Sequence, residues 1–396
     1  MQPASRRGPR KKRPRPKTPG AIRRVTTRAK PLSPSDDERY MRECLALARP
    51  LVGLTTPNPA VGCVIVRGHR IVGRGATAPG GRPHAETVAL ARAGARARGA
   101  TAYVSFEPCA HQGQTPPCAR ALVEAGVGRV VIGCRDPYPL VRGRGIATLR
   151  RAGISTVVGV LEDDSGRLNE GFITRVTRGR PLALLKLAVT LDGRIAAANG
   201  DSRWISSEAS RRLVHQWRRE SDVVMVGAGT IIADNPRLTC RIAGGRDPAR
   251  LIVDPHLRCD PGAAIFHLRS RAPTIIATTA GNQMAARRRY GSRTEVIAVA
   301  PAGAGLRLAA LMRELGRRGW CRVLIEGGAH LAGAALRAGI VDRVAFFVAP
   351  RILGGGLAAV EGLAAPTMRA ALRLDQMAAR PVGDDWLIEA AIAHAR

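Results

Sequence analysis

Short apolar runs of strand length alternate with stretches of helical periodicity along most of the chain, and this alternation constrains the fold most strongly. In the first half, strand–helix alternation predicts α/β layering around a mixed or parallel sheet. The expected strands are 62–66, 70–72, 102–106, 129–133 and 156–160, with helices at 84–98, 119–125 and 144–152 and one opening near Asp36. A helical period of apolar residues follows the acidic group 36–38, where a helix N-terminus favours negative charge.

A second α/β series follows an interruption at Gly179, Arg180 and Pro181. Its expected strands are 182–191, 223–226, 250–253, 274–278, 295–299, 322–325 and 343–348, and its helices are 208–220, 306–318 and 331–338. A length of 396 residues suits two domains. We therefore expect a tail over residues 1–35, one domain over 36–178 and a second over 179–396.

The formal charge of +33 admits a nucleic-acid-binding protein as an alternative. Residues 1–30 hold 12 basic and no acidic side chains, and the remaining excess is spread along the chain. All but five basic residues are Arg, which together with many Ala and Gly is typical of genome-wide codon composition. We expect no specific nucleic-acid partner and a disordered, solvated tail. A polyanion-binding arm, a transit peptide or translation starting near Met41 are the alternatives for the tail.

No apolar run approaches the ~18–20 residues of a membrane span, and no apolar signal segment stands near the start. Eight cysteines are scattered without the spacing of a disulfide framework. These features predict a cytoplasmic protein without a membrane partner.

One group of residues has the composition of a catalytic zinc site: His84-Ala85-Glu86, then Pro108-Cys109 and Cys118. One imidazole and two thiolates leave the fourth position of a tetrahedral zinc open to water, whose pKa the metal lowers. Glu86 is spaced to move protons without binding the metal. The H-x-E…P-C pattern is typical of zinc deaminases of the cytidine type, although eight residues, where two are usual, separate these cysteines. The ordinary alternative is a pair of buried thiols and a surface imidazole.

Three segments resemble the deaminase half of the bifunctional riboflavin-biosynthesis deaminase–reductases: residues 57–62, 83–86 and 107–118, the last with the long inter-cysteine loop of that family. The segment Asp136-Pro137-Tyr138-Pro139 is similar too, with Tyr138 where the family usually has Asn. The resemblance implies a cytidine-deaminase-like α/β/α sandwich in which Asn58 hydrogen-bonds the pyrimidine. Within that loop, we expect His111 to be a loop or substrate contact rather than a fourth metal ligand, because a fourth protein ligand would close the zinc to water.

In the second half, Lys186 is the only lysine beyond the tail, and Gly327-Gly328 joins a strand to a helix. Such a junction suits a phosphate, because small residues and free helix N–H groups let it approach. The segments 186–194, 200–206, 226–230, 233–241 and 325–333 resemble the reductase half of the same family. The resemblance implies a dihydrofolate-reductase-like α/β domain and NADPH. The implied cofactor contacts are Ala188, Trp204, Thr230, Asp234, Gly328, Ala329, His330, Leu331, Ala332, Gly333 and Ala334.

The residues implied to meet the substrate in the second half are Ser202, Arg218, Leu238, Arg241 and Glu326. Arg218 and Arg241 suit a ribose 5′-phosphate, because guanidinium groups match phosphate oxygens in pairs. The resemblance implies deamination of 2,5-diamino-6-(5-phosphoribosylamino)pyrimidin-4-one followed by reduction of the ribosyl side chain, by a homo-oligomer. The rivals are a base-editing nucleic-acid enzyme and a chain with one inactive half.

Overall fold

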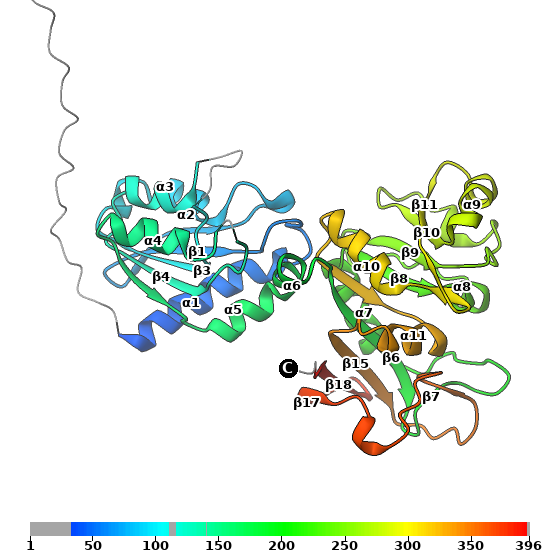
Figure 1. The fold of residues 1–396 in the computed structure, drawn as a ribbon. Coiled ribbons are helices and arrows are strands. Elements are labelled where there is room, and N and C mark those ends of the chain that lie inside the picture. The colour runs from blue at the N-terminus through cyan, green and yellow to red at the C-terminus, as the bar shows by residue number, and fades with distance from the viewer. Residues whose placement is uncertain (1–32, 111–115, 140, 394–396) are drawn as a thin grey trace, which may run out of the picture.

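The computed structural model describes residues 33–110, 116–139 and 141–393, and its two large sheets lie in separate halves of the chain (Figure 1). The first sheet has the order β2-β1-β3-β4-β5. Strand β1 pairs antiparallel with β2 and β3, whereas β3, β4 and β5 run parallel. The strands are β1 (Gly62–Arg67), β2 (Arg70–Ala76), β3 (Thr101–Phe106), β4 (Arg129–Cys134) and β5 (Ser155–Val158).

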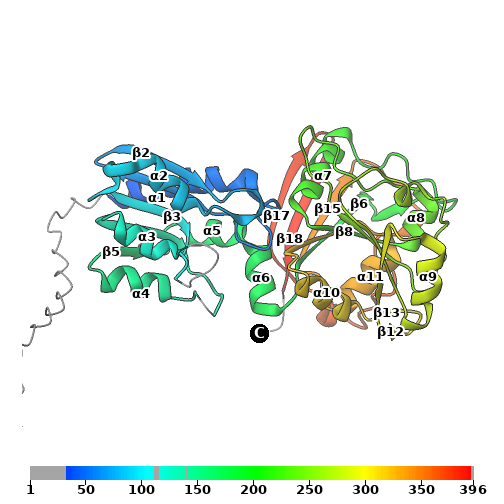
Figure 2. The ribbon, with the colours of Figure 1, turned by 90° about the horizontal axis from the view of Figure 1, so that it is seen from above.

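Helices cover both faces of this sheet (Figure 2). Cys63 and Ile65 of β1 pack toward the helices α2 (Ala85–Ala93), α3 (Cys118–Glu124) and α4 (Arg144–Arg151). Val64 and Val66 point to the opposite face and pack against α1 (Pro34–Ala48), beside which α5 (Glu162–Leu168) lies. Successive residues of a strand face opposite sides, so the apolar run of β1 supplies both cores. The result is an α/β/α sandwich, as expected.

Helix α1 begins at Pro34, inside the segment expected to be a tail. The Ser33 side chain accepts a hydrogen bond from Asp36 N, and the Asp36 carboxylate accepts one from Ser33 N. This reciprocal capping box fixes the start of the helix. Residues 1–32 of the expected tail, and His111, lie outside the described residues.

The second sheet has the order β11-β10-β9-β8-β14-β6-β15-β18-β17, parallel from β11 to β15, with antiparallel β18 and β17 at the far edge. Its strands are β6 (Leu182–Thr190), β8 (Val223–Gly227), β9 (Ala249–Val253), β10 (Thr274–Thr278), β11 (Thr294–Ala298), β14 (Arg322–Ile325), β15 (Arg343–Ala349), β17 (Leu374–Val382) and β18 (Asp385–Ile392). Two short ribbons pair β7 (Arg194–Ala196) with β16 (Leu357–Ala358) and β12 (Pro301–Ala302) with β13 (Gly305–Leu306).

Helices also cover both faces of the second sheet (Figure 2). One face packs against α10 (Leu308–Arg317) and α11 (Ala329–Arg337), and the other against α7 (Glu208–Glu220), α8 (Ala228–Asp234) and α9 (Gln283–Tyr290). Between the two halves, α6 (Glu170–Arg178) ends four positions before β6 begins. No helix among the described residues is long and apolar enough to cross a membrane.

Most expected strands and helices are present, with shifted ends. The helix expected over 84–98 is shorter in the structure: α2 ends at Ala93, and Gly94 begins a 3₁₀ turn (Gly94–Ala97). Glycine has a low helix propensity, which explains the break. The strand expected over 70–72 is longer in the structure, because β2 continues to Ala76 beside β1. Helices α5, α6, α8 and α9 and strands β17 and β18 were not anticipated.

Candidate functional site

The imidazole of His84 and the thiols of Cys109 and Cys118 meet at one point of the first half. His84 is the N-cap of α2, Cys109 follows β3, and Cys118 begins α3. Nδ1 of His84 lies 3.2 Å from Sγ of Cys118 and 3.6 Å from Sγ of Cys109. The three ligand atoms all lie within 4.8 Å of one another. A tetrahedral zinc with bonds of about 2.0–2.3 Å requires such spacing, so this donor set fits the metal.

Glu86 lies in the first turn of α2, with only 4% of its surface exposed. Burial, and then the charge of Cys109, raise the pKa of Glu86 to about 7. The pKa of Cys109 is lowered to about 4, chiefly by hydrogen bonding with Cys118 and also with His84. A thiolate is the form that binds a metal ion. The same hydrogen bond, together with burial, raises the pKa of the Cys118 thiol, so the site combines one thiolate, at Cys109, with a carboxyl group poised to exchange a proton near neutral pH.

Glu107, directly before Pro108-Cys109, is a site residue whose role the sequence did not reveal. Its buried carboxylate accepts hydrogen bonds from four backbone N–H groups of a later segment, at Asp136 (3.3 Å), Gly143 (3.1 Å), Gly145 (3.1 Å) and Ile146 (3.4 Å). Two of these donors lie in the first turn of α4, which has no intrahelical acceptor for them. Glu107 thus fixes the segment 136–146 beside the ligand Cys109.

The same segment requires glycine at position 145. A Cβ atom there would lie 2.0 Å from Pro108 O, so any side chain would push the segment away from the cysteine loop. Nearby, the Asp136 carboxylate accepts a hydrogen bond from Tyr138 N at 2.8 Å, and Tyr138 is 36% exposed. Burial raises the pKa of Asp136 to about 7.

Asn58 lies on the loop that precedes β1. Its Nδ2 donates to Gly81 O at 3.1 Å, and Gly81 stands three positions before His84. The loop is tied to α6 as well, because the Asn169 side chain pairs with both N and O of Ala60 at 2.8 and 3.0 Å. Asn58 therefore lies on the segment packed against the approach to the metal ligands.

In the second half, Lys186 lies on β6 and Glu326 directly follows the neighbouring parallel strand β14, whose last residue, Ile325, is in register with Leu185 of β6. Glu326 forms a two-point ion pair with Arg218 of α7, at 2.7 Å to Nε and 2.9 Å to Nη2, and Nη1 of Arg218 donates to Thr239 O at 3.1 Å. Burial opposes ionisation of Glu326, but the charges of Arg218 and Lys186 lower its pKa overall. Burial lowers the pKa of Lys186, against the charge of Glu326.

The expected phosphate site lies at the carboxyl edge of the same strands, where ligands bind in open α/β sheets. Gly328 is the N-cap of α11, and a Cβ there would lie 3.8 Å from Oγ1 of Thr230. Arg203 links two further expected segments, because its guanidinium donates to Asp234 O at 3.2 Å and it precedes Trp204. Leu331 and Ala332 are buried in the core, so only their backbone could meet a phosphate.

The remaining expected residues differ in their accessibility. Trp204 is 61% exposed, with the Arg211 guanidinium 4.5 Å from its ring centre. Arg241 is exposed, Ser202 is half-buried, and Leu238 is buried at 4%. Ala188 lies on β6 opposite Phe347 of β15. The expected phosphate partner Arg218 has most of its guanidinium committed to Glu326, whereas Arg241 faces outward.

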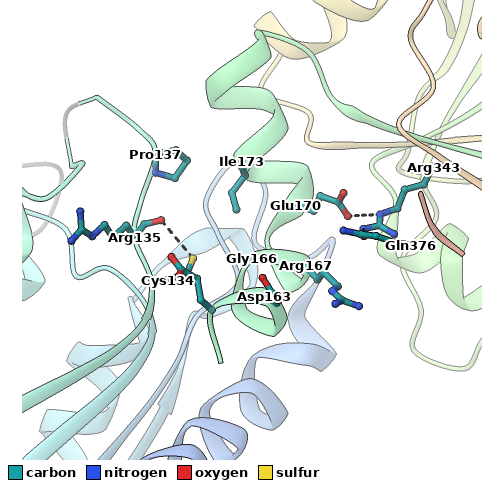
Figure 3. Close-up of a pocket in the computed structure, with 11 residues that line it drawn as sticks. Cys134, Arg135, Pro137, Asp163, Gly166, Arg167, Glu170, Ile173, Arg343 and Gln376 are labelled. Carbon is teal, nitrogen blue, oxygen red and sulfur yellow. Dashed lines mark hydrogen bonds and ion pairs between the residues drawn. The ribbon is translucent and has the colours of Figure 1, made fainter. Parts of the chain in front are cut away.

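A cavity of about 440 Å³ separates the end of β4 from strands β15 and β17 (Figure 3). Glu170 and Arg343 meet across it, with Oε2 and Nε 2.7 Å apart. Its lining includes none of the three metal ligands, Glu86 or Asn58, and consists of Cys134, Arg135, Pro137, Glu162, Asp163, Gly166, Arg167, Glu170, Ile173, Arg343 and Gln376. The candidate chemistry lies outside this cavity.

Two family models match separate parts of the chain. Residues 34–134 match the family model of the cytidine and deoxycytidylate deaminase zinc-binding region, and residues 181–388 match that of the RibD C-terminal domain. The riboflavin biosynthesis protein RibD of Aquifex aeolicus is 39% identical over 354 residues, which are 89% of this chain and 97% of the relative. That of Escherichia coli is 39% identical over 343 residues, 83% of this chain and 92% of the relative.

Two solved structures share the fold over most of this chain. Acinetobacter baumannii RibD superimposes with a TM-score of 0.81 at 36% identity, over 91% of this chain and all of that one. A diaminohydroxyphosphoribosylaminopyrimidine deaminase/5-amino-6-(5-phosphoribosylamino)uracil reductase from Thermotoga maritima gives 0.82 at 35% identity, over 91% and 99%. The expected fold class is confirmed. The chain belongs to the family of bifunctional deaminase–reductases of riboflavin biosynthesis.

Proposed function

We propose that the first half deaminates 2,5-diamino-6-(5-phosphoribosylamino)pyrimidin-4-one by hydrolysis, and that the second half uses NADPH to reduce the ribosyl group of 5-amino-6-(5-phosphoribosylamino)uracil to ribityl. The observation that carries the proposal is the meeting of His84, Cys109 and Cys118 beside the buried Glu86. Membership of the family supports both reactions. We place the boundary between the two halves at Arg178 and Gly179, where α6 ends.

In the deamination, His84, Cys109 and Cys118 would hold zinc, which would supply a water of lowered pKa. The Glu86 carboxylate would take one proton from the attacking water and give it to the ring nitrogen beside the carbon that bears the amino group. Glu86 would then take the second proton, from the hydroxyl added at that carbon, and give it to the amino group, which leaves as ammonia while the carbonyl forms. A carboxyl whose pKa is raised to about 7 can both take and return a proton at neutral pH. Asn58 would hydrogen-bond the pyrimidine.

In the reduction, the first turn of α11 at Gly328, Ala329 and His330 would bind the phosphates of NADPH through backbone N–H groups. Ala188, Trp204, Thr230 and Asp234 would line the rest of the cofactor. NADPH supplies the hydride, and the protein holds nicotinamide and ribosyl group in contact.

Among the residues proposed to meet this second substrate, we assign the phosphate mainly to Arg241, because Arg218 is occupied by Glu326. Ser202 and Leu238 would lie against the substrate. Glu326 and Lys186 would face its ribosyl group.

The test separates the two activities in the intact chain. Glu86→Gln should abolish ammonia release and keep NADPH oxidation on the deaminated substrate and the zinc content. Cys109→Ser should lower zinc content and ammonia release together. Glu124→Gln, on the exposed face of α3, is the matched control. Ammonia release by the zinc-free protein, or by the Glu86→Gln variant, would contradict the assignment.

We also propose that the protein works as a homo-oligomer in the cytoplasm. Strand β17 ends the second sheet, and eight of its nine residues are exposed. Large apolar side chains gather there, and a second copy of the chain would cover them: Met368, Leu372, Leu374, Met377 and Trp386 are 43–90% exposed. Eight free cysteines support a reducing compartment.

A further inference from the structure

The loop of residues 49–61, which carries Asn58 and is here called the Asn58 loop, lies against the second half of the chain. We propose that side chains of the reductase half position this loop, so that substrate binding in the deamination depends on residues outside the deaminase half. The inference rests on the substrate contact of Asn58 proposed above.

Two arginines of the second half hold the beginning of the loop. Arg219 of α7 donates through Nη2 to Pro50 O at 2.8 Å, and Nη2 of Arg246 donates to Gly53 O at 2.6 Å. Arg246 is itself paired with Asp222, at 3.3 Å to Oδ1. Hydrogen bonds from a charged donor are stronger than neutral ones, so these contacts can fix a loop backbone.

Arg246 is anchored to the core of the second sheet rather than to another loop. The Asp222 side chain is 1% exposed, and its Oδ2 accepts hydrogen bonds from Cys321 N at 2.7 Å and Arg322 N at 3.0 Å. Asp222 therefore joins the beginnings of β8 and β14 and presents its other oxygen to Arg246. The position of Gly53 is in this way tied to two buried strands.

Gly53 allows this close approach. Its φ of +78° lies in the left-handed region, and a Cβ atom would lie 2.5 Å from Glu220 O at the end of α7. Farther along the loop, Pro57 lies 3.4 Å from the position that a Cβ of Gly319 would take. The loop thus packs directly on the second half at two places, through the backbone of Gly53 and the ring of Pro57.

Hydrogen bonds inside the loop link the position of Asn58 to that of Gly53. Thr55 Oγ1 donates to Asn58 O at 3.0 Å, and Asn58 N donates to Thr55 O at 2.9 Å. Gly80 N donates to Leu54 O at 2.8 Å, on the turn that leads to His84. A displacement at Gly53 would therefore shift Asn58 relative to the metal ligands.

The other end of the loop is held within the first half, by Asn169 at Ala60 and by Arg175, whose Nη2 donates to Pro57 O at 3.0 Å. Loss of the two arginines from the second half should hence displace the loop without releasing it. We expect weaker substrate binding rather than loss of the zinc site.

The test is the double variant Arg219→Ala/Arg246→Ala in the full chain. The KM for ammonia release should rise about tenfold, because displacements near 1 Å have effects of this order or more. The kcat, the zinc content and the rate of NADPH oxidation on the deaminated substrate should stay within about twofold. Arg269→Ala, at an exposed position, is the control and should change neither activity.

Two results would overturn the inference: an unchanged KM in the double variant, or an equal loss of both activities with lower stability, which a merely structural contact would give. Asn58→Ala separates this inference from the proposed function. If the KM for ammonia release rises in Asn58→Ala but is unchanged in the double variant, only the positioning of the loop by the second half is rejected. An unchanged KM in Asn58→Ala rejects the substrate contact itself.

Discussion

Arg218 and Glu326 lie 108 positions apart in the sequence, yet they form a two-point ion pair at the carboxyl edge of the second sheet. Both side chains are nearly buried, at 13% and 10% exposed. Removing such a pair from water costs free energy, so its burial beside Lys186 indicates that the Glu326 carboxylate is needed in a fixed orientation. We interpret Arg218 as the residue that orients Glu326 for the reduction.

Arg218→Met should abolish most of the reductase activity and lower the free energy of unfolding by about 3–5 kcal/mol, because Glu326 would be left buried and unpaired. NADPH oxidation on the deaminated substrate and denaturant unfolding measure the two effects. The double variant Arg218→Met/Glu326→Leu should recover stability while remaining inactive in reduction. If Arg218→Met kept both stability and reduction, the ion pair would have neither role.

The pH dependence of stability should report on Asp136. Burial raises its folded pKa from 3.8 to about 7, so the folded protein binds a proton that the unfolded chain has already lost. The stability from this group is present below pH 3.8 and is lost as pH rises toward 7. As the pH rises from 3.8 to about 7, the free energy of unfolding of Asp136→Asn should therefore increase relative to that of the unchanged protein.

Urea unfolding of both proteins at several pH values from 4 to 8 measures this difference. Asn keeps the oxygen that accepts from Tyr138 N, so the variant removes the charge and retains that hydrogen bond. A stability difference that does not change with pH would show that Asp136 is ionised in the folded protein as in the unfolded one.

If the protein is a homo-oligomer, a single substitution on its interface should lower the molecular mass measured in solution. Met377→Glu places a charge on the exposed strand β17, where Met377 is 70% exposed, and should yield monomers in light scattering. Met284→Glu is the matched control, because Met284 is 63% exposed on α9. A monomeric unchanged protein at the same concentration would reject the oligomer.

Residues that act within a short motif could be located from the sequence alone. His84, Glu86, Cys109 and Cys118 were identified by type and spacing, and the structure brings the three ligands together. The strands with continuous apolar runs were found for the same reason, since both of their faces are buried. Strand β17 has eight exposed residues and no apolar alternation, so periodicity gave no signal for it.

Other features depend on contacts between distant segments. The acidic residues 162–164 at the start of α5 were a usable helix signal that was overlooked. No such signal marks Asn169, whose amide pairs with Ala60 109 positions earlier, or the contact of Arg246 with Gly53. The first contact depends on packing within the first half and the second on packing between the halves, and a local sequence pattern encodes neither.

Glu107 provides the last prediction. Glu107→Gln replaces one acceptor oxygen by an NH₂ group that faces backbone donors, so at least part of the four-donor contact to segment 136–146 is lost. Hydrogen bonds to charged groups contribute about 1.5–3 kcal/mol, and we expect a stability loss of about 2 kcal/mol. Ammonia release should fall more than about tenfold at retained zinc content, because the segment beside Cys109 would move. Reduction should persist, and Glu124→Gln should change neither activity. An equally active Glu107→Gln variant would show that segment 136–146 is placed by other contacts.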